Sequence, residues 1–204
     1  MMWNKTMPGP GDERWFWPAW GVAFVGFPIG GSAAFLLLGP IETTVTAALG
    51  GAIAGGVIGA AQWLVLRRRL PLSALWVPAT AAGMAVGLTL GQVVLGDGTT
   101  AVPLLLRGLV AGAAIGAAQA LLLRGVLPTP LVWAVVVTVA WAVAWAVTAA
   151  FGVNLAEKWA VSGTSGALTF QLITGLTLAY LLQQSARTRA PAHARRPVGA
   201  AGGS

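Results

Sequence analysis

The sequence predicts an all-α membrane protein with six transmembrane helices, built from tandem two-helix hairpin repeats. Three observations indicate this fold class. First, 57% of the 204 residues are hydrophobic and only 8% are charged, whereas about 25% of the residues of a soluble domain are charged. Second, six apolar segments are each as long as the roughly 20 helical residues that cross a bilayer. Third, a fourteen-residue phrase occurs twice, 57 residues apart.

The six predicted spans are separated by short breaks that carry turn or charge signals. The spans cover residues 15–38, 41–66, 74–95, 103–123, 131–153 and 159–182, and the breaks contain GP, RRRLP, GDGTT, RGVLPTP and NLAEK. The six-helix domain therefore covers residues 15–183. Residues 1–14 are expected to form a cytoplasmic N-terminal segment and residues 184–204 a disordered basic cytoplasmic tail, because both are polar and rich in Pro, Gly, Ala or Arg.

The repeated phrase belongs to a larger duplicated unit. IGAAQWLVLRRRLP at residues 58–71 and IGAAQALLLRGVLP at residues 115–128 are identical at ten positions, and Trp76 matches Trp133 at the same offset. The matched parts of the second and fourth spans cross the membrane in the same direction, so the repeat is parallel rather than inverted. A weaker third copy, ITGLTLAYLLQ in the sixth span, completes three hairpins around a pseudo-threefold axis. These hairpins cover about residues 15–66, 74–123 and 131–182.

Glycines at every fourth position mark one face of the second span and one face of the fourth. In lipid, no hydrophobic force drives helices together, and small residues instead let two backbones approach and gain dispersion contacts. We therefore expect both spans to be inner helices that pack through these glycines. The positions are Gly51, Gly55, Gly59, Gly108, Gly112 and Gly116.

The distribution of Lys and Arg predicts the orientation. With six spans, one side of the membrane receives both termini and the two loops that follow the second and fourth spans. That side holds ten basic residues, Lys5, Arg14, Arg67, Arg68, Arg69, Arg124, Arg187, Arg189, Arg195 and Arg196, and the other side holds Arg107 and Lys158. The positive-inside rule then places both termini in the cytoplasm of a cell whose plasma membrane contains the protein.

Composition excludes several kinds of chemistry. The chain has no cysteine, which excludes a disulfide framework, a thiolate metal site and a cysteine nucleophile. The single histidine, His193, lies in the polar tail, so a histidine-based metal site or a Ser-His-Asp triad within the membrane is also excluded. The net charge of +7 comes from residues that flank apolar segments, not from the basic aromatic patch that nucleic-acid binding needs. We expect no enzymatic activity and no cofactor.

Three glutamines are the most polar groups predicted deep within the spans. Gln62 and Gln119 are equivalent in the repeat, and Gln171 is the deepest amide of the sixth span. An amide without partners in hydrocarbon costs several kcal/mol. We expect the glutamines to join helices by hydrogen bonds, and the alternative is that they form a polar constriction on a solute path.

The tryptophans divide into two predicted groups. An aromatic belt at the membrane interfaces is expected from Trp15, Trp17, Trp20, Trp63, Trp76, Trp133 and Trp159. Trp141 and Trp145 instead share one face in the middle of the fifth span, where they would pack in the bundle, face lipid, or flank a bound apolar ligand. Arg107 is predicted a few residues inside the fourth span, where it would pair with Asp97 or extend to the headgroups.

The phrase GAAQWLVLRRRLP, followed by Trp76 and a glycine-rich span, resembles a group of uncharacterised bacterial multipass membrane proteins. The resemblance covers about residues 40–185 and is strongest over residues 51–76 and 108–133. It implies a location in the bacterial inner membrane. It implies no activity, ligand or site residue.

These observations support three hypotheses about function. The first is a non-catalytic scaffold or accessory subunit that packs against another membrane protein or a second copy of this chain. The second is a passive channel or uncoupled transporter of a small solute, lined by the three glutamines. The third is a binding site for a lipid or quinone beside Trp141 and Trp145.

Overall fold

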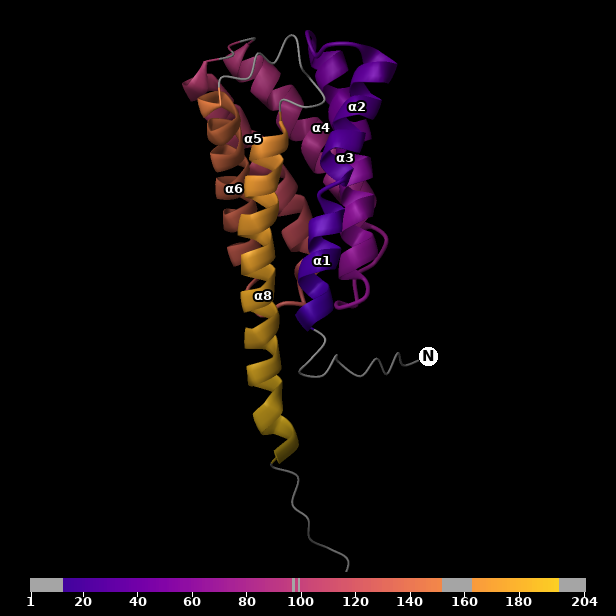
Figure 1. Cartoon of the computed structure of the whole chain (residues 1–204), viewed down its shortest axis with the longest axis vertical. Helices are drawn as coiled ribbons and strands as arrows, with labels where there is room; N and C mark the ends of the chain where they lie inside the picture. Colours follow the sequence, from indigo (N-terminus) through magenta and orange to yellow (C-terminus); the bar gives the residue numbers. More distant parts are fainter. Residues whose placement is uncertain (1–12, 97, 99, 152–162, 195–204) are drawn as a thin grey trace, which may run out of the picture.

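The computed structural model describes residues 13–96, 98, 100–151 and 163–194, and its regular structure is helical (Figure 1). The helices are α1 (Glu13–Ala23), α2 (Gly26–Leu38), α3 (Thr44–Leu66), α4 (Trp76–Leu95), α5 (Ala101–Leu123), α6 (Pro130–Ala150) and α8 (Thr164–Ala194). Within these described residues, six helical segments are long and apolar enough to cross a membrane, with α1 and α2 together forming the first. The predicted fold class, an all-α multipass membrane protein with six spans, is confirmed.

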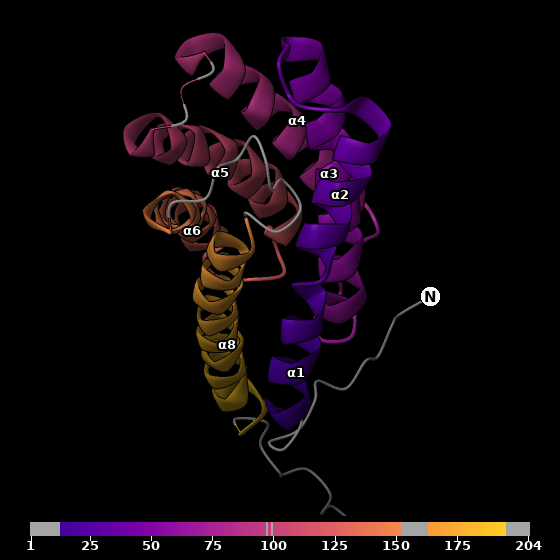
Figure 2. The ribbon, with the colours of Figure 1, turned by 45° about the horizontal axis from the view of Figure 1, so that its top comes forward.

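The helices form a ring in which neighbours along the chain are neighbours in space. The closest pairs are α3 with α4 and α5 with α6, and α4 packs on α5 between them. Figure 2 shows α2, α3 and α4 on one side of the bundle and α5, α6 and α8 on the other. The ring closes where α8 meets α1 and α2, and this seam has the fewest contacts of those between neighbouring helices.

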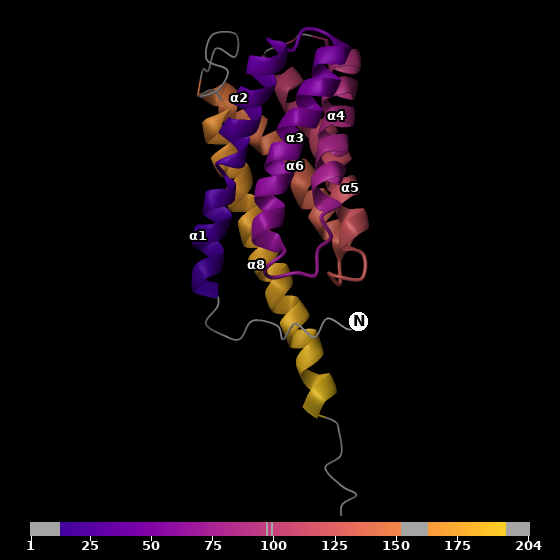
Figure 3. The same ribbon diagram turned by 90° about the vertical axis from the view of Figure 1, so that its right-hand side faces the viewer.

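The first described helix begins, and the last one ends, on the same side of the bundle. Figures 1 and 3 both show α1 beginning at the end of the bundle toward which α8 runs. The connections from α3 to α4 and from α5 to α6 lie at this end too, which we call the terminal end. We call the other end, where α2 connects to α3, the distal end.

The first span is broken where the sequence predicted one continuous helix over residues 15–38. Pro28 is the cause, because it has no N–H to donate to the Phe24 carbonyl and its ring crowds that carbonyl. The amide of Phe27 instead donates to the Phe24 carbonyl over 2.9 Å, in a tighter turn. The result is a change of course between α1 and α2, visible in Figure 3.

Specific residues end or begin the other helices. Gly39 and Gly96 adopt positive φ angles of 74° and 60° immediately after α2 and α4, a conformation that glycine adopts without steric cost. Thr43 caps α3: its hydroxyl accepts from the Thr46 amide over 3.1 Å, and the Thr46 hydroxyl accepts from the Thr43 amide over 3.0 Å. The predicted breaks GP and GDGTT therefore contain the residues that stop the helices.

The last helix extends beyond the predicted sixth span. We expected a disordered tail from residue 184, but α8 continues to Ala194. Alanine and arginine, which are strong helix formers, are frequent in the added segment. Three of the predictions fall outside what the structure describes. They concern the start of the sixth span at residues 159–162, which includes the belt residue Trp159, the side chain of the belt residue Trp15, and the tail over residues 195–204.

The glycines of α3 lie against the backbone of α4. A β-carbon on Gly55 would come within 2.8 Å of the Thr80 carbonyl oxygen, and one on Gly51 within 2.8 Å of the Met84 carbonyl oxygen. Real β-carbons essentially never make contacts below 3.0 Å. Gly59 would likewise meet the Thr80 side chain at 2.9 Å. The two helices can approach this closely only because these positions have no side chain.

The glycines of α5 lie against α6 in the same way, and the contacts match at the 57-residue offset. Gly51 faces Ala85 and Gly108 faces Ala142. Further along α3, Gly55 faces Ala81 and Gly59 faces Val77. The equivalent glycines of α5 face the residues 57 positions later: Gly112 faces Thr138, and Gly116 faces Ala134. The packing surfaces of α3–α4 and α5–α6 are thus equivalent residue by residue. The arrangement of three hairpins around a pseudo-threefold axis stays a prediction.

Other glycines that the sequence pattern did not single out also allow close contacts. A β-carbon on Gly83 of α4 would meet the Ile115 Cα of α5 at 2.7 Å, and one on Gly30 of α2 would meet the Ala54 carbonyl oxygen of α3 at 2.9 Å. Gly166 of α8 faces the Ala144 carbonyl of α6. Glycine contacts therefore join α2 to α3, α4 to α5, and α6 to α8 as well.

We predict that Gly55→Ala destabilises the bundle by about 1–3 kcal/mol, because the new methyl group overpacks the contact with α4. Gly56→Ala is the matched control: its β-carbon would meet only Ala81 Cβ at 4.0 Å, and the gain in helix propensity leaves stability unchanged or slightly higher. The midpoint of thermal unfolding in a maltoside detergent measures both. Equal midpoints for the two variants would contradict the assignment.

Candidate functional site

Gln62 and Gln119 lie together in the interior near the terminal end. Their side chains are 2% and 1% exposed. The Gln119 Nε2 atom donates to the Thr80 hydroxyl over 3.0 Å and lies 3.4 Å from Gln62 Oε1. The Thr80 hydroxyl can accept this bond because its own proton goes to the Trp76 carbonyl, 2.8 Å away. The repeat thus brings its two amides into direct contact.

Each glutamine also accepts a bond from the tryptophan fourteen residues later. Trp76 Nε1 lies 3.4 Å from Gln62 Oε1, and Trp133 Nε1 lies 3.0 Å from Gln119 Oε1. The two indole rings are neighbours, with centroids 6.3 Å apart. These side chains form one polar network, made of Gln62, Trp76, Thr80, Gln119 and Trp133, which links α3, α4, α5 and α6.

Gln171 is separate from this network. Its Nε2 atom donates to the Trp20 carbonyl, and Trp20 Nε1 donates to the Gln171 carbonyl over 2.9 Å. This reciprocal pair joins α8 to α1, where a β-carbon on Gly175 would strike the Trp20 ring at 2.7 Å. Two of the three predicted amides are therefore brought together, and the third closes the ring of helices elsewhere.

The expectation that Trp20, Trp76 and Trp133 belong to an interfacial belt is wrong. They are 1%, 0% and 0% exposed and lie in the interior. The physical reason is that each indole N–H has an acceptor inside the bundle, so the ring need not lie at the headgroups to satisfy it. Trp17, by contrast, is 41% exposed, as a belt residue would be.

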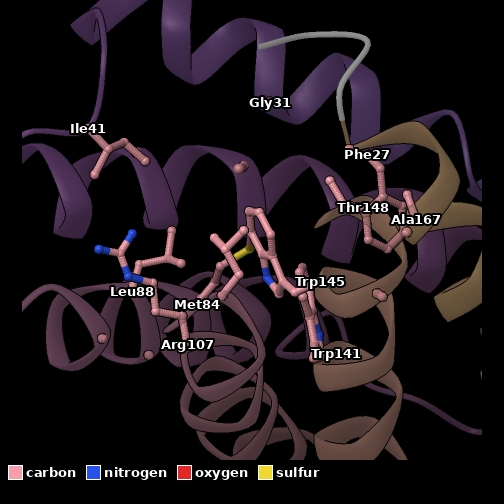
Figure 4. A pocket seen from close by; sticks show the side chains of 18 of the residues that line it. Phe27, Gly31, Ile41, Met84, Leu88, Arg107, Trp141, Trp145, Thr148 and Ala167 are labelled. Atoms are coloured by element: carbon pink, nitrogen blue, oxygen red, sulfur yellow. The ribbon is translucent and has the colours of Figure 1, made fainter. Parts of the chain in front are cut away.

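A cavity of about 790 Å³ occupies the distal half of the bundle. Residues of α2, α3, α4, α5, α6 and α8 line it, together with the connection from α2 to α3 (Figure 4). Its inner limit is set by Ile58 and Met84, each one helical turn from the polar network at Gln62 and Thr80. None of Gln62, Gln119 and Gln171 is among its lining residues.

The inner wall of the cavity is aromatic. Trp141, Phe27 and Phe170 come from three different helices and contact one another, with centroid distances of 5.2 Å for Trp141–Phe170 and 5.5 Å for Phe27–Phe170. Trp145, one turn further along α6, also lines the cavity and packs against α5, since a β-carbon on Gly108 would meet its ring at 2.9 Å. The sequence-predicted pair Trp141 and Trp145 thus faces this cavity and the bundle interior.

Arg107 is the single basic residue among the described residues that line the cavity, and Glu42 is the single acidic one. The Arg107 side chain is half-buried, and its Nε and Nη2 atoms are covered and have no hydrogen-bond acceptor among the residues that the structure describes. Glu42 is exposed to solvent on the connection between α2 and α3. Asp97, the predicted partner of Arg107, lies outside the described residues.

Other unpartnered groups at the cavity are also donors. The Nε1 atoms of Trp141 and Trp145 are buried and have no acceptor in the described part of the chain. The other buried side-chain atoms that lack a partner among the described residues, Gln171 Oε1 and the Ser165 hydroxyl, belong to residues that do not line the cavity. Within residues 13–96, 98, 100–151 and 163–194, no three His, Asp or Glu side chains gather as metal ligands would.

Comparison with protein-family models, with curated proteins and with solved structures found no match to this chain. The resemblance to bacterial multipass membrane proteins therefore stays a prediction.

Sequence reasoning singled out Arg107, Trp141 and Trp145 but missed the other residues that line the cavity. Phe27 and Phe170 gave no signal in the sequence, because an aromatic residue in an apolar span is ordinary. Arg107 gave the strongest signal that was available, since a charge inside a span is a functional hypothesis by default. Its cavity, however, depends on how six helices meet, which no local pattern reports.

We predict that Gln119→Leu destabilises the protein by about 1–3 kcal/mol, because it leaves the Trp133 N–H buried without an acceptor and removes the bond to Thr80. Gln183→Leu, at an exposed position of α8, serves as the control and leaves stability unchanged. Both are measured as unfolding midpoints in the same detergent. A Gln119→Leu protein as stable as the control would show that the polar network adds nothing.

Proposed function

We propose that this chain is a non-catalytic protein of the bacterial inner membrane that holds a membrane-soluble molecule inside its helical bundle. The observation that carries the proposal is the cavity of about 790 Å³ with aromatic walls. Sites for small molecules typically measure about 300–1,000 Å³ and combine apolar walls with a few polar groups. The occupant would be of lipid or quinone size.

The position of the cavity favours an occupant that comes from the bilayer. Both α2 and α8 line it, through Phe27, Phe35, Ala167 and Phe170, and these two helices make few contacts with each other. The seam between them is therefore the least tightly packed side of the distal half. An apolar molecule could pass between these helices without leaving the hydrocarbon.

The accessory role expected from the sequence fits this proposal, since holding a membrane molecule requires no reaction. We also propose, from the distribution of Lys and Arg, that the terminal end faces the cytoplasm. The cavity would then open toward the outer leaflet. The outward side chains are apolar, such as Leu36, Val94 and Leu131 at 81%, 70% and 75% exposure, as a lipid-facing surface requires.

A passive channel is less well supported. The glutamines that would line it are bonded to Trp76, Thr80, Trp133 and Trp20. The cavity ends at Ile58 and Met84, and the polar network fills the space one turn beyond them.

We predict that the protein purified in a mild maltoside carries a bound molecule of lipid or quinone mass, detected by native mass spectrometry. Ala167→Phe places a ring in the cavity and reduces the bound fraction several-fold. Leu168→Phe is the matched control, because Leu168 follows Ala167 in the chain but is 52% exposed on the outer face. The Leu168→Phe protein retains the molecule. Wild-type protein without a bound molecule, or equal retention by both variants, would refute the proposal.

A further inference from the structure

We propose that the cavity selects an amphipathic molecule with an anionic head, a carboxylate or a phosphate on an alkyl chain, and that Arg107 binds the head. This inference rests on the proposed function and specifies the chemical class of the occupant. It follows from the charges at the cavity, from the hydrogen-bonding groups left over there, and from the depth at which each of them lies.

The charged groups at the cavity favour an anionic occupant. Arg107 is the one basic residue among the described residues that line the cavity, and a guanidinium stays protonated at physiological pH. A charge inside a membrane span is costly and generally has a partner or a function. The only acidic side chain among the same lining residues, Glu42, is exposed on the connection from α2 to α3. The cavity thus offers a half-buried cation.

The unpaired buried groups at the cavity are hydrogen-bond donors. Within the described part of the chain, four buried atoms of lining residues have no acceptor: Nε and Nη2 of Arg107, and Nε1 of both Trp141 and Trp145. All four are donors, and each unpaired donor costs about 1–3 kcal/mol. An occupant that removes this cost must bring acceptors. A carboxylate or phosphate brings several, and a guanidinium can bind either through two parallel bonds.

The charged group and the aromatic wall lie at different depths in the cavity. Arg107 lies on the second turn of α5, toward the distal end, whereas Phe27, Trp141 and Phe170 form the inner wall. Figure 4 shows the Arg107 guanidinium on the side of Ile41 and Leu88, away from Trp141 and Ala167. The polar and the apolar parts of the cavity are therefore separated along its length. An amphipath fits this order with its head at Arg107 and its chain toward the aromatic wall.

The N–H groups of Trp145 and Trp141 would bind different parts of the occupant. Trp145 packs against Gly108, the residue next to Arg107, so its N–H is the nearer of the two to the expected position of the head. Trp141 lies one turn deeper, among the phenylalanines. An ester or hydroxyl oxygen just below the head would provide an acceptor at this level.

The test compares five probes on purified wild-type protein in a neutral maltoside: dodecyl phosphate, dodecanoate, dodecanol, a decyl-benzoquinone and inorganic phosphate. Apparent affinities come from titrated shifts of the unfolding midpoint. We expect the two alkyl anions to bind about tenfold or more tightly than dodecanol and the quinone, because a charge-assisted bond is worth at least one factor of ten. Inorganic phosphate, which has no chain, neither binds at the same concentration nor displaces dodecyl phosphate.

The variant Arg107→Gln removes the charge and keeps hydrogen-bonding capacity. It lowers the affinity for both alkyl anions to the level of dodecanol and leaves dodecanol binding unchanged. Arg124→Gln, at an exposed arginine near the terminal end, keeps the wild-type preference. The comparison among probes on wild-type protein needs no variant, so it decides the question even if Arg107→Gln does not fold.

The outcomes separate the two proposals. Binding of the alkyl probes without preference for an anion, or a preference that persists in Arg107→Gln, would overturn the anionic head and leave the proposed function intact. A quinone that binds more tightly than either anion would also overturn it. Displacement of dodecyl phosphate by inorganic phosphate would indicate a site for free anions. If no chain-bearing probe binds, the proposed function itself fails.

Discussion

The whole bundle depends on the direct contact between helix backbones at glycine. Helices in lipid gain no hydrophobic energy by associating, so their attraction must come from close packing and from polar bonds. Gly55 against Thr80 and Gly112 against Thr138 place backbone atoms where a β-carbon would fit only with displacement. These contacts hold α3 to α4 and α5 to α6 as two close pairs, and the other helices are arranged around them.

The polar network joins the same two helix pairs, α3–α4 and α5–α6, to each other in the terminal half of the bundle. Gln62 and Gln119 follow the last of these glycines on their helices by three residues. Gln62 accepts a bond from Trp76, and Gln119 accepts one from Trp133, each on the helix that the glycines contact. The close approach of the backbones brings these side chains within bonding distance of each other. On the opposite side of the ring, Trp20 and Gln171 make a corresponding closure between α1 and α8. The polar network and this pair therefore occupy buried positions in the terminal half of the bundle.

The distal half is built differently. The break before Pro28 changes the direction of the chain between α1 and α2, and α2 makes few contacts with α8. The space between them is bordered by the aromatic group of Phe27, Trp141 and Phe170 and by the unpaired donors of Arg107 and Trp145. If the protein holds a membrane-soluble molecule as proposed, the hydrogen-bonded terminal half would support the bundle and the cavity in the distal half would supply the site.

The sequence predicted those features that depend on local composition and spacing. Six apolar segments gave the six spans, and glycines at every fourth position gave the packing faces of α3 and α5. It could not identify the partners, because the spacing of Gln62 does not reveal that Trp76 and Gln119 lie within reach. The belt assigned to Trp20, Trp76 and Trp133 was wrong for this reason: nearness to a span end does not determine which way a ring points. The cavity depends on the mutual placement of six helices, and only Arg107, Trp141 and Trp145 gave a sign of it in the sequence.

The most direct test of the account is the density inside the cavity of protein purified from its native membrane, determined by cryo-electron microscopy in a lipid nanodisc. The account predicts an elongated density along the wall of Phe27, Trp141 and Phe170, with its polar end at the Arg107 guanidinium. A distal half in which α2 and α8 pack together, with no space between them and with Arg107 paired to a carboxylate of the protein, would contradict it.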